Sequence, residues 1–375
     1  MKKILFVTGT RADYGKLKPL AQSAQKLGHY VGFWITGMHV LEEYGLTKLE
    51  IYKDNYDFID EYINQKPGDL QSIVIAKTVT TFTDYLIEKS PDLVVIHGDR
   101  LEALACSIAA ATNYIKILHV EGGEVSGTID EVFRHSISKF SNVHCVSSDD
   151  ARSRLIRMGE NPNSIHNIGS PELDSHLACD PTILVHVKNH YNIHFDDYGI
   201  VIFHPVTSET ETILSQAKQL FATLVETQKN FVVIKPNNDP GSTQVNQIIK
   251  NLPNRRFRVL PSMRFEYFSV LLQNSSGLVG NSSAGVREAP FVGIASLNVG
   301  TRQTNRSSCG SITHVSADDQ IGILEFFDCE WGKKYNRDIS FGEGVSIKKF
   351  SKMLETNDLF ERVTQKIFYD VQSDW

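Results

Sequence analysis

The chain has 375 residues, of which 41% are hydrophobic and 22% charged, and this suits two globular domains of ordinary size better than one core. A formal net charge of -6 without any basic run excludes a general attraction for nucleic acid, and no apolar segment is long enough to span a bilayer. Five widely spaced cysteines without a C-x-x-C pair indicate neither a disulfide framework nor a metal site, so we expect a cytoplasmic enzyme without metal.

Short apolar strands alternate with amphipathic helices through the first half of the chain. One helix is predicted by Leu101, Leu104, Ala105, Ile108 and Ala109, whose spacing places them on one face. Continuously apolar strands separated by helices indicate a parallel sheet that is covered on both faces. The predicted strands are Lys3–Thr8, Tyr30–Thr36, Leu93–His97, Ile115–Val120, Val143–Ser147 and Ile165–Ile168.

The pattern is interrupted at about 170–197, where turn residues and polar clusters predict a linker. It restarts with four strands, in YGIVIFHPV, NFVVIKPN, SGLVGNSS and IASLNVG, and with a helix over about 213–225. We therefore predict an α/β protein with two Rossmann-like, doubly wound domains facing across a cleft. We place the first domain at 1–170 and the second at 171–350. A C-terminal helix in 351–375 is expected to pack back on the first domain.

Each conspicuous polar cluster directly follows a predicted strand, where ligands bind in doubly wound sheets. The cluster after the strand ending at Val120 is acidic, with Glu121, Glu124, Asp130 and Glu131 close together. Carboxylates that share a dry site tend to have their pKa values driven apart, which gives one acid and one base. The other clusters are GTRADYGK, HGDR, HPVTSE and GNSSAGVRE. Acids combined with phosphate-binding loops in both domains indicate a nucleotide-sugar site.

In the first domain, each of these residues also has a purely structural interpretation. Arg11 and Lys16 suit an anion near a helix N-terminus, but a turn with Asp13 as a helix cap explains the same motif. Asp99 precedes a helix and is therefore also a candidate N-cap. Asp130 at the start of another predicted helix is favoured there by the helix dipole, whatever its function.

In the second domain, the same two kinds of interpretation apply. Small residues around Ser282 and Ser283 predict a helix start whose amides approach a diphosphate. Glu288, about two turns into that helix, suits a ribose diol, or else is a surface charge paired with Arg287. His204 is either a ligand to the nucleotide or a strand-end histidine that the backbone satisfies.

Taken in order, the motifs closely resemble those of the hydrolysing UDP-N-acetylglucosamine 2-epimerases of sialic acid biosynthesis. The resemblance covers nearly the whole chain. It rests on GTRADYGKLKPL, TGMHVLEEYG, HGDRLEALA, HVEGGEVSGTIDEVFRHSISK, GSPELD, FHPVT, NNDPGS, GNSSAGVREAP and LNVGTRQTNR. It implies the GT-B architecture and conversion of UDP-GlcNAc and water to N-acetylmannosamine and UDP, the first step of sialic acid synthesis. It also implies that no cofactor is needed, that UDP-GlcNAc and UDP are the ligands, and that the enzyme is a homodimer.

The resemblance also assigns roles to residues. Asp99, Glu121 and Asp130 become the acid and base set, with Glu131 competing with Asp130, and His204 contacts the diphosphate as a cation. The order in which the acids act stays open. The residues expected to bind the UDP-sugar are Arg11, Lys16, Arg100, Phe265, Ser282, Ser283, Glu288 and Arg302.

Three other functions are compatible with the sequence. In the non-hydrolysing relatives, the motif that resembles HVEGG contains an alanine, and SGG stands where this chain has SSA. The segments HVEGGEVSGTIDE and GNSSAG of this chain therefore resemble the hydrolysing branch. Within that branch, the substrate is either UDP-GlcNAc or a UDP-2,4-diacetamido-trideoxy sugar of a legionaminic-type pathway. A GT-B glycosyltransferase and a nucleotide-sugar sensor without activity are the alternatives outside it.

Overall fold

The computed structural model describes residues 1–66, 68–237, 239–356, 358–361 and 364–370. The chain forms two compact units. Unit 1 comprises Met1–Glu124, Asp130–Asp174 and the described residues from Phe341 onward, and unit 2 comprises Val125–Ile129 and Ser175–Ser340. The units thus change over after Asp174 and after Ser340, whereas the domain boundaries expected from the sequence, at 170 and 350, stay a prediction.

Unit 1 is built on a seven-stranded sheet in which all strand pairs are parallel. The strand order is β3-β2-β1-β4-β5-β6-β7. Burial on both faces explains why these strands are continuously apolar rather than alternating. The strands are β1 (Lys3–Thr8), β2 (Tyr30–Ile35), β3 (Phe58–Glu61), β4 (Leu93–His97), β5 (Lys116–Val120), β6 (Val143–Val146) and β7 (Ile165–Asn167).

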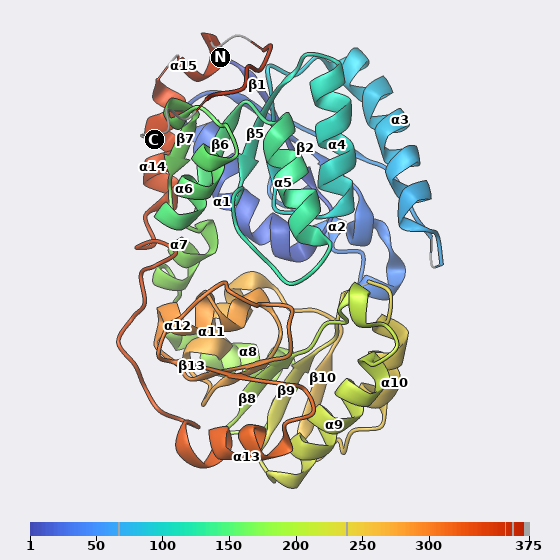
Figure 1. The fold of residues 1–375 in the computed structure, drawn as a ribbon, viewed down its shortest axis with the longest axis vertical. Coiled ribbons are helices and arrows are strands. Elements are labelled where there is room, and N and C mark those ends of the chain that lie inside the picture. Colours follow the sequence, from blue (N-terminus) through green and yellow to red (C-terminus); the bar gives the residue numbers. More distant parts are fainter. Residues whose placement is uncertain (67, 238, 357, 362–363, 371–375) are drawn as a thin grey trace. The chain divides into compact units, whose positions relative to one another are not determined.

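Helices cover both faces of this sheet (Figure 1). One apolar cluster joins Leu17 and Leu20 of α1 to Phe350 and Leu354 of α14, and another includes Phe82 of α3 and residues of α4. The C-terminal part of the chain therefore completes the core of unit 1. The helices of this unit are α1 (Arg11–Lys26), α2 (Lys48–Tyr52), α3 (Gln71–Lys89), α4 (Leu101–Thr112), α5 (Asp130–Phe140), α6 (Asp149–Arg157), α14 (Ser346–Glu355) and α15 (Asp358–Glu361).

Unit 2 repeats the architecture with a six-stranded parallel sheet in the order β10-β9-β8-β11-β12-β13. Its strands are β8 (Gly199–Ile202), β9 (Phe231–Ile234), β10 (Phe257–Leu260), β11 (Leu278–Gly280), β12 (Ser296–Val299) and β13 (Ile312–Val315). Its helices are α8 (Leu184–His190), α9 (Ile213–Glu226), α10 (Ser242–Lys250), α11 (Phe265–Gln273), α12 (Glu288–Val292) and α13 (Gln320–Cys329). Helices α9 and α13 pack on one face, and α8 and α11 on the other (Figure 1).

The linker predicted over 170–197 is wrong. This segment forms α7 (Pro171–Leu177), a 3-10 turn (Pro181–Ile183) and α8. Val187, Ile193 and Tyr198 are buried in the core of unit 2, so the segment is part of the domain. The prolines that suggested a break are the first residues of α7 and of the 3-10 turn, a position where a missing N–H costs nothing.

The predicted fold class is confirmed, because both units are doubly wound parallel sheets of the Rossmann type. Within the described residues, no helix is both long and apolar enough to cross a lipid bilayer.

Candidate active site

The predicted acidic residues of unit 1 lie near the point where the order of its strands reverses. Strand β1 is followed in the chain by β2 on one side of it, and β4 lies on its other side. Doubly wound sheets bind ligands beyond the carboxyl ends of strands at such a point. The segments that follow β1, β4 and β5 carry Arg11, Asp99 and Glu121, respectively.

Glu121 directly follows β5 and is buried in an unusual backbone conformation. Its φ is +64°, which an L-residue with a side chain adopts at a cost of about 1 kcal/mol or more. Its carboxylate lies 2.9 Å from Lys16 Nζ, accepts a hydrogen bond from Ser170 Oγ at 2.9 Å, and lies 3.3 Å from His97 Nε2. Strained residues with a charged side chain cluster at functional sites, so Glu121 is the strongest candidate for chemistry.

Lys16 lies between two buried carboxylates. Besides Glu121, its Nζ lies 3.4 Å from Glu172 Oε1 at the start of α7. Ser170 Oγ lies 2.7 Å from Glu172 and 2.9 Å from Glu121, but one hydroxyl proton serves only one of them at a time. Lys16 therefore supplies the counter-charge that these acids need when buried, and its predicted contact with UDP stays a prediction.

His97 and Glu172 contact the predicted site but were not predicted from the sequence. His97 is the last residue of β4 and pairs in register with Val120, the residue before Glu121. Its place in HGDR at a strand end was the only available signal. Glu172 lies in GSPELD, a motif that the resemblance included, but nothing in its spacing connects it with Glu121.

Asp99 is held by α5 rather than acting as a helix cap. Helix α4 begins at Leu101, and the carboxylate of Asp99 pairs with the buried guanidinium of Arg134. The helix start predicted at Asp130 is confirmed, and Asp130 lies one turn before Arg134. The competing residue Glu131 lies 3.7 Å from the imidazole of His135. The loop of Asp99 is thus tied to the helix that begins with Asp130.

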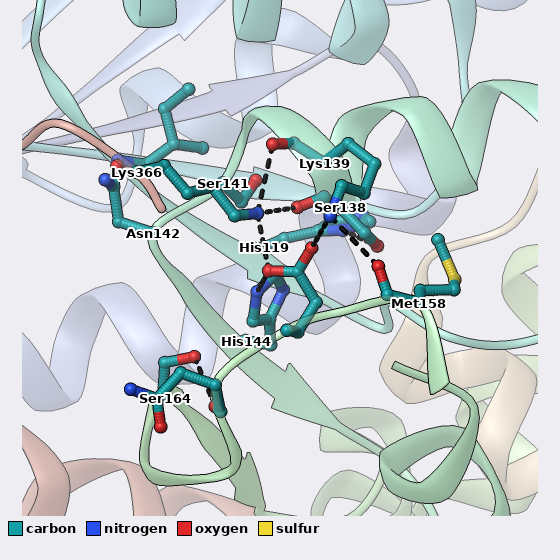
Figure 2. Close-up of polar contacts among 12 residues, drawn as sticks. His119, Ser138, Lys139, Ser141, Asn142, His144, Met158, Ser164 and Lys366 are labelled. Atoms are coloured by element: carbon teal, nitrogen blue, oxygen red, sulfur yellow. Dashed lines mark hydrogen bonds and ion pairs between the residues drawn. The ribbon is translucent and has the colours of Figure 1, made fainter. Parts of the chain in front are cut away.

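A second connection between this loop and α5 runs through His119. Its Nε2 donates to the carbonyl of Gly98 at 2.8 Å. Its Nδ1 lies 3.0 Å from Ser138 Oγ on α5, and both of these residues are labelled in Figure 2. Burial lowers the pKa of His119 to about 3, so the ring is neutral and Nδ1 accepts from Ser138. A side chain at Gly122 would lie 2.9 Å from both His119 Nδ1 and Ser138 Oγ, which explains a glycine there.

The C-terminal end of α5 is also held by a charge cluster around the buried Glu160. His144 Nε2, Lys139 Nζ and Lys366 Nζ lie 3.0, 2.7 and 2.5 Å from its carboxylate. The three basic side chains converge in Figure 2. Lys366 also donates to the carbonyls of Ser138 and Lys139 at 2.8 and 3.0 Å, near the C-terminus of the helix. A cation is favoured at a helix C-terminus, so the C-terminal segment helps to fix α5.

Within this cluster, burial and the neighbouring charges shift the pKa values of Glu160 and Lys366 in opposite directions. Burial alone would raise the pKa of Glu160, but the hydrogen bond from His144 and the charges of His144 and Lys366 outweigh it and lower the pKa to about 2. Burial lowers the pKa of Lys366 to about 8, although Glu160 opposes this. The carboxylate is therefore ionised at neutral pH.

At the N-terminus of α1, Asp13 takes part in capping, but the N-cap residue is Thr10 and Asp13 is the buried third residue of the helix. Its carboxylate accepts from the amides of Gly9 and Thr10 at 3.0 Å each, in a capping box with Thr10. Arg11, the first residue of α1, pairs with Glu50. Arg100 precedes α4, with its Nε 3.7 Å from Glu102 Oε2.

In unit 2, the strand order reverses between β8 and β11, and the loops after these two strands are joined by Asn281. Its side chain accepts from the amide of His204 at 2.7 Å and donates to the carbonyl of the same residue at 2.8 Å. Gly280 makes this possible, because its φ is +132° and a Cβ there would lie 2.0 Å from the carbonyl oxygen of Ile202. Arg302 Nη1 donates to the carbonyl of Asn281 at 3.3 Å. Asn281, which had been given no role, thus organises the predicted diphosphate loop.

The imidazole of His204 is held in one tautomer. The amide of Asn237 donates to its Nδ1 at 3.2 Å. A nitrogen that accepts carries no proton, so this geometry fits a neutral ring with its proton on Nε2. The cation predicted for His204 does not fit this arrangement, and a neutral Nε2–H donor does.

The helix predicted to open at Ser282 is interrupted. Ser282 caps a 3-10 turn, Ser283–Gly285, by accepting from the amide of Ala284, and α12 begins only at Glu288. Pro290 explains the break, because proline is tolerated only in the first turn of a helix. Glu288 is thus the first residue of α12, not two turns into a helix.

The interpretation of Glu288 as a surface charge is also wrong. Its carboxylate is buried and lies 2.8 Å from Nε2 of His176, a residue that was not predicted. Phe265, the first residue of α11, is half-buried, and its ring centroid lies 5.3 Å from that of His176. The two residues predicted to contact the nucleoside therefore share one neighbour. Among the described residues, no group of three potential metal ligands is found.

The chain is similar to known proteins of one family along nearly its whole length. The family described as UDP-N-acetylglucosamine 2-epimerase matches residues 27–355. The chain is 40% identical over 377 residues to a UDP-N-acetylglucosamine 2-epimerase of Neisseria meningitidis serogroup B, and this alignment covers 99% of the chain and 100% of that protein. It is 30% identical over 373 residues to a UDP-N,N'-diacetylbacillosamine 2-epimerase (hydrolyzing) of Legionella pneumophila, with 98% and 99% covered.

The fold is also found among solved structures. The UDP-GlcNAc 2-epimerase of Methanocaldococcus jannaschii, crystallised in complex with UDP-GlcNAc and UDP, superposes with a TM-score of 0.81 at 19% identity. The match covers 94% of this chain and 99% of that one. At this identity the likeness concerns the fold, and it agrees with the predicted GT-B class. Together with the full-length relatives, these results make the chain a member of the UDP-N-acetylglucosamine 2-epimerase family.

Proposed function

We propose that the protein is a hydrolysing 2-epimerase that converts UDP-GlcNAc and water to N-acetylmannosamine and UDP. The observation that carries this proposal is the setting of Glu121: a buried carboxylate with a strained backbone, in contact with Lys16, Ser170 and His97. Removing a proton from the weakly acidic C2 of a sugar requires a fixed base of this kind.

The reaction has two steps. In the first, Glu121 takes the C2 proton, a double bond forms between C1 and C2, and the bond from C1 to the UDP oxygen breaks, giving a glycal and UDP. In the second, water adds its hydroxyl to C1 while a second acid delivers a proton to C2 from the opposite face. The proton lost by water restores that acid, and Glu121 releases the proton taken from C2 to solvent. Asp99 and Asp130, which are connected through α5, are the proposed candidates for this second acid. Glu131 is the alternative to Asp130.

UDP is proposed to be held by residues at the strand ends. In unit 2 these are Phe265 and Glu288 for the nucleoside, with Ser282, Ser283 and Arg302 near the diphosphate. His204 favours departure of UDP by donating Nε2–H to an oxygen that gains negative charge. Arg11, Lys16 and Arg100 of unit 1 complete the proposed set. The reaction creates no net oxidation, so no redox cofactor is required.

The glycine pair in HVEGG supports assignment to the hydrolysing branch. A side chain at Gly123 is excluded, because its φ is +78° and a Cβ would lie 2.4 Å from the carbonyl oxygen of Ala151. An alanine in this motif fits this chain better at Gly122, where a Cβ would lie 2.9 Å from both His119 Nδ1 and Ser138 Oγ and would require a shift there. The contact between His119 and Ser138, which supports the loop of Asp99, therefore depends on Gly122.

The product places the enzyme at the start of sialic acid synthesis, since N-acetylmannosamine is the precursor of these acids. We further propose that the enzyme acts in the cytoplasm as a homodimer, a state that two-fold symmetry makes common. A second candidate substrate is a UDP-2,4-diacetamido-trideoxy sugar, which the similarity to the Legionella enzyme favours. The higher identity to the Neisseria enzyme favours UDP-GlcNAc.

The two substrates can be compared without any acceptor. We expect UDP and N-acetylmannosamine to appear in equal amounts from UDP-GlcNAc, with a kcat/KM at least about tenfold higher than for the diacetamido sugar nucleotide, because a misfitted substituent costs this much. A coupled assay for UDP and proton NMR of the sugar measure both. A preference for the diacetamido substrate would replace the proposed substrate, and failure to release UDP without an acceptor would contradict hydrolysis.

A further inference from the structure

His176, which the proposed chemistry does not use, lies at the centre of a buried hydrogen-bonded chain in unit 2. It belongs to α7, and its side chain is fully buried. Its Nε2 lies 2.8 Å from Glu288 Oε2, and its Nδ1 lies 2.7 Å from Ser269 Oγ on α11. Gln273, also on α11, donates to the carbonyl of His176 at 2.8 Å.

The partners determine where the protons lie. A carboxylate oxygen only accepts, so the proton on Nε2 points to Glu288. The side chain of Gln273 lies 3.4 Å from Ser269 Oγ as a donor, which leaves the serine hydroxyl to donate to Nδ1. The hydrogen bonds therefore run in one direction, from Ser269 through His176 to Glu288.

This chain uses only one of the two carboxylate oxygens of Glu288. Among the residues that the structure describes, Oε1 of Glu288 has no hydrogen-bond partner, whereas Oε2 is held by His176. The carboxylate is thus fixed in orientation, with one oxygen left to accept from a ligand.

The same imidazole also contacts the aromatic side of the proposed nucleoside site. Its ring is edge-on to Phe265, with centroids 5.3 Å apart, and lies 6.5 Å from Phe268. Helices α11 and α12 are neighbours (Figure 1). His176 is hydrogen-bonded to a residue of each. Any shift of His176 would move the residues proposed for uracil and for ribose together.

We propose that His176 is a positioning residue that sets the preference of the site for a ribonucleotide. It orients Glu288 so that Oε1 accepts from the ribose 2'-hydroxyl, the group that an acidic residue reads in other doubly wound folds. The inference rests on the proposed UDP site and concerns nucleotide binding, not the reaction. A site built to hydrogen-bond a hydroxyl discriminates strongly against the analogue that lacks it.

Two substitutions separate the roles of the imidazole nitrogens. In His176→Asn, the amide replaces Nδ1 near Ser269 but does not reach Glu288. In His176→Gln, the amide nitrogen takes the place of Nε2 and still donates to Glu288. His314→Asn is the matched control, because His314 lies on β13 and contacts Asn298 instead. Titration calorimetry of the full chain with UDP and with 2'-deoxy-UDP measures the preference.

We expect His176→Asn to reduce the preference for UDP over 2'-deoxy-UDP by about tenfold or more, the worth of one hydrogen bond to a charged group. His176→Gln and His314→Asn should keep it. In kinetics, His176→Asn should raise KM for UDP-GlcNAc with kcat within about threefold, since it alters binding rather than transition-state contacts. In the Glu288→Gln background, His176→Asn should change nothing more, because it acts through Glu288.

An unchanged preference for UDP over 2'-deoxy-UDP in His176→Asn would overturn the inference. It would also be overturned if adding His176→Asn to Glu288→Gln lowered the preference as much as His176→Asn does alone. If His176→Asn does not fold, His176→Gln carries the test: because its amide still donates to Glu288, loss of the preference in this variant would overturn the inference. The proposed function is judged separately by UDP release from UDP-GlcNAc, so an active enzyme with an unchanged preference refutes only the role of His176.

Discussion

Replacing Glu121 by Gln is expected to lower kcat by about a thousandfold, because the amide cannot accept the C2 proton. The fold and the KM for UDP-GlcNAc should change little. Gln has the size of Glu, it can still accept from Lys16 and Ser170, and it bears the same backbone strain at φ +64°. Lys16 keeps Glu172 as a counter-charge. The measurement is the rate of UDP release at saturating substrate.

Glu61→Gln is the control for this substitution. Glu61 also ends a strand of the same sheet, but it is exposed and pairs with Lys48 at 2.8 Å. The Glu61→Gln substitution should leave kcat unchanged. A kcat for folded Glu121→Gln within about tenfold of the unsubstituted enzyme would remove Glu121 as the base, and Asp99 and Asp130 would then be the remaining candidates.

Replacing Glu160 by Gln should lower the free energy of unfolding of unit 1 by about 3 kcal/mol at pH 7. The substitution leaves Lys366 and Lys139 buried or half-buried beside a neutral amide. Urea-dependent hydrogen exchange of peptides from α5 and β6, read by mass spectrometry, reports on this unit alone. The exposed ion pair removed by Glu61→Gln should cost less than about 1 kcal/mol.

The effect of Glu160 should also depend on pH. Its pKa is lowered to about 2 in the folded chain, compared with about 4.3 in an unfolded one. A carboxylate with a lowered pKa stabilises the fold fully above the unfolded value, and this stabilisation is lost as the pH falls toward 2. The difference in free energy of unfolding between the unsubstituted protein and Glu160→Gln should therefore shrink between about pH 5 and pH 3. A difference that is already small at pH 7, or that grows on acidification, would show that the cluster is not held by an ionised Glu160.

The central strands and the edge strand β7 could be predicted from the sequence, but the other three edge strands could not. Strands β1, β4, β5, β8 and β11 lie inside their sheets, are buried on both faces and therefore read as apolar runs. The strands without a prediction, β3, β10 and β13, all lie at sheet edges. Their sequences, FIDE, FRVL and ITHV, contain polar residues because one side of an edge strand faces solvent or a loop.

The residues of the candidate site that directly follow a strand could be predicted from the sequence. Asp99, Glu121 and His204 follow strands, and this position alone indicated a role. Their partners Glu172 and Asn281 could not be predicted, because each contact joins segments that only the folded sheet brings together. The protonation of His204 likewise depends on the amide of Asn237, a backbone contact that carries no sequence signal.

The reaction of UDP-GlcNAc in deuterium oxide tests the central claim most directly, that a carboxylate removes the C2 proton and water then hydrates the glycal. Proton NMR and mass spectrometry of the products at early times should show free N-acetylmannosamine carrying one deuterium at C2, together with an equal amount of UDP. A sugar that keeps its original hydrogen at C2, or an epimer that stays attached to UDP, would contradict the account.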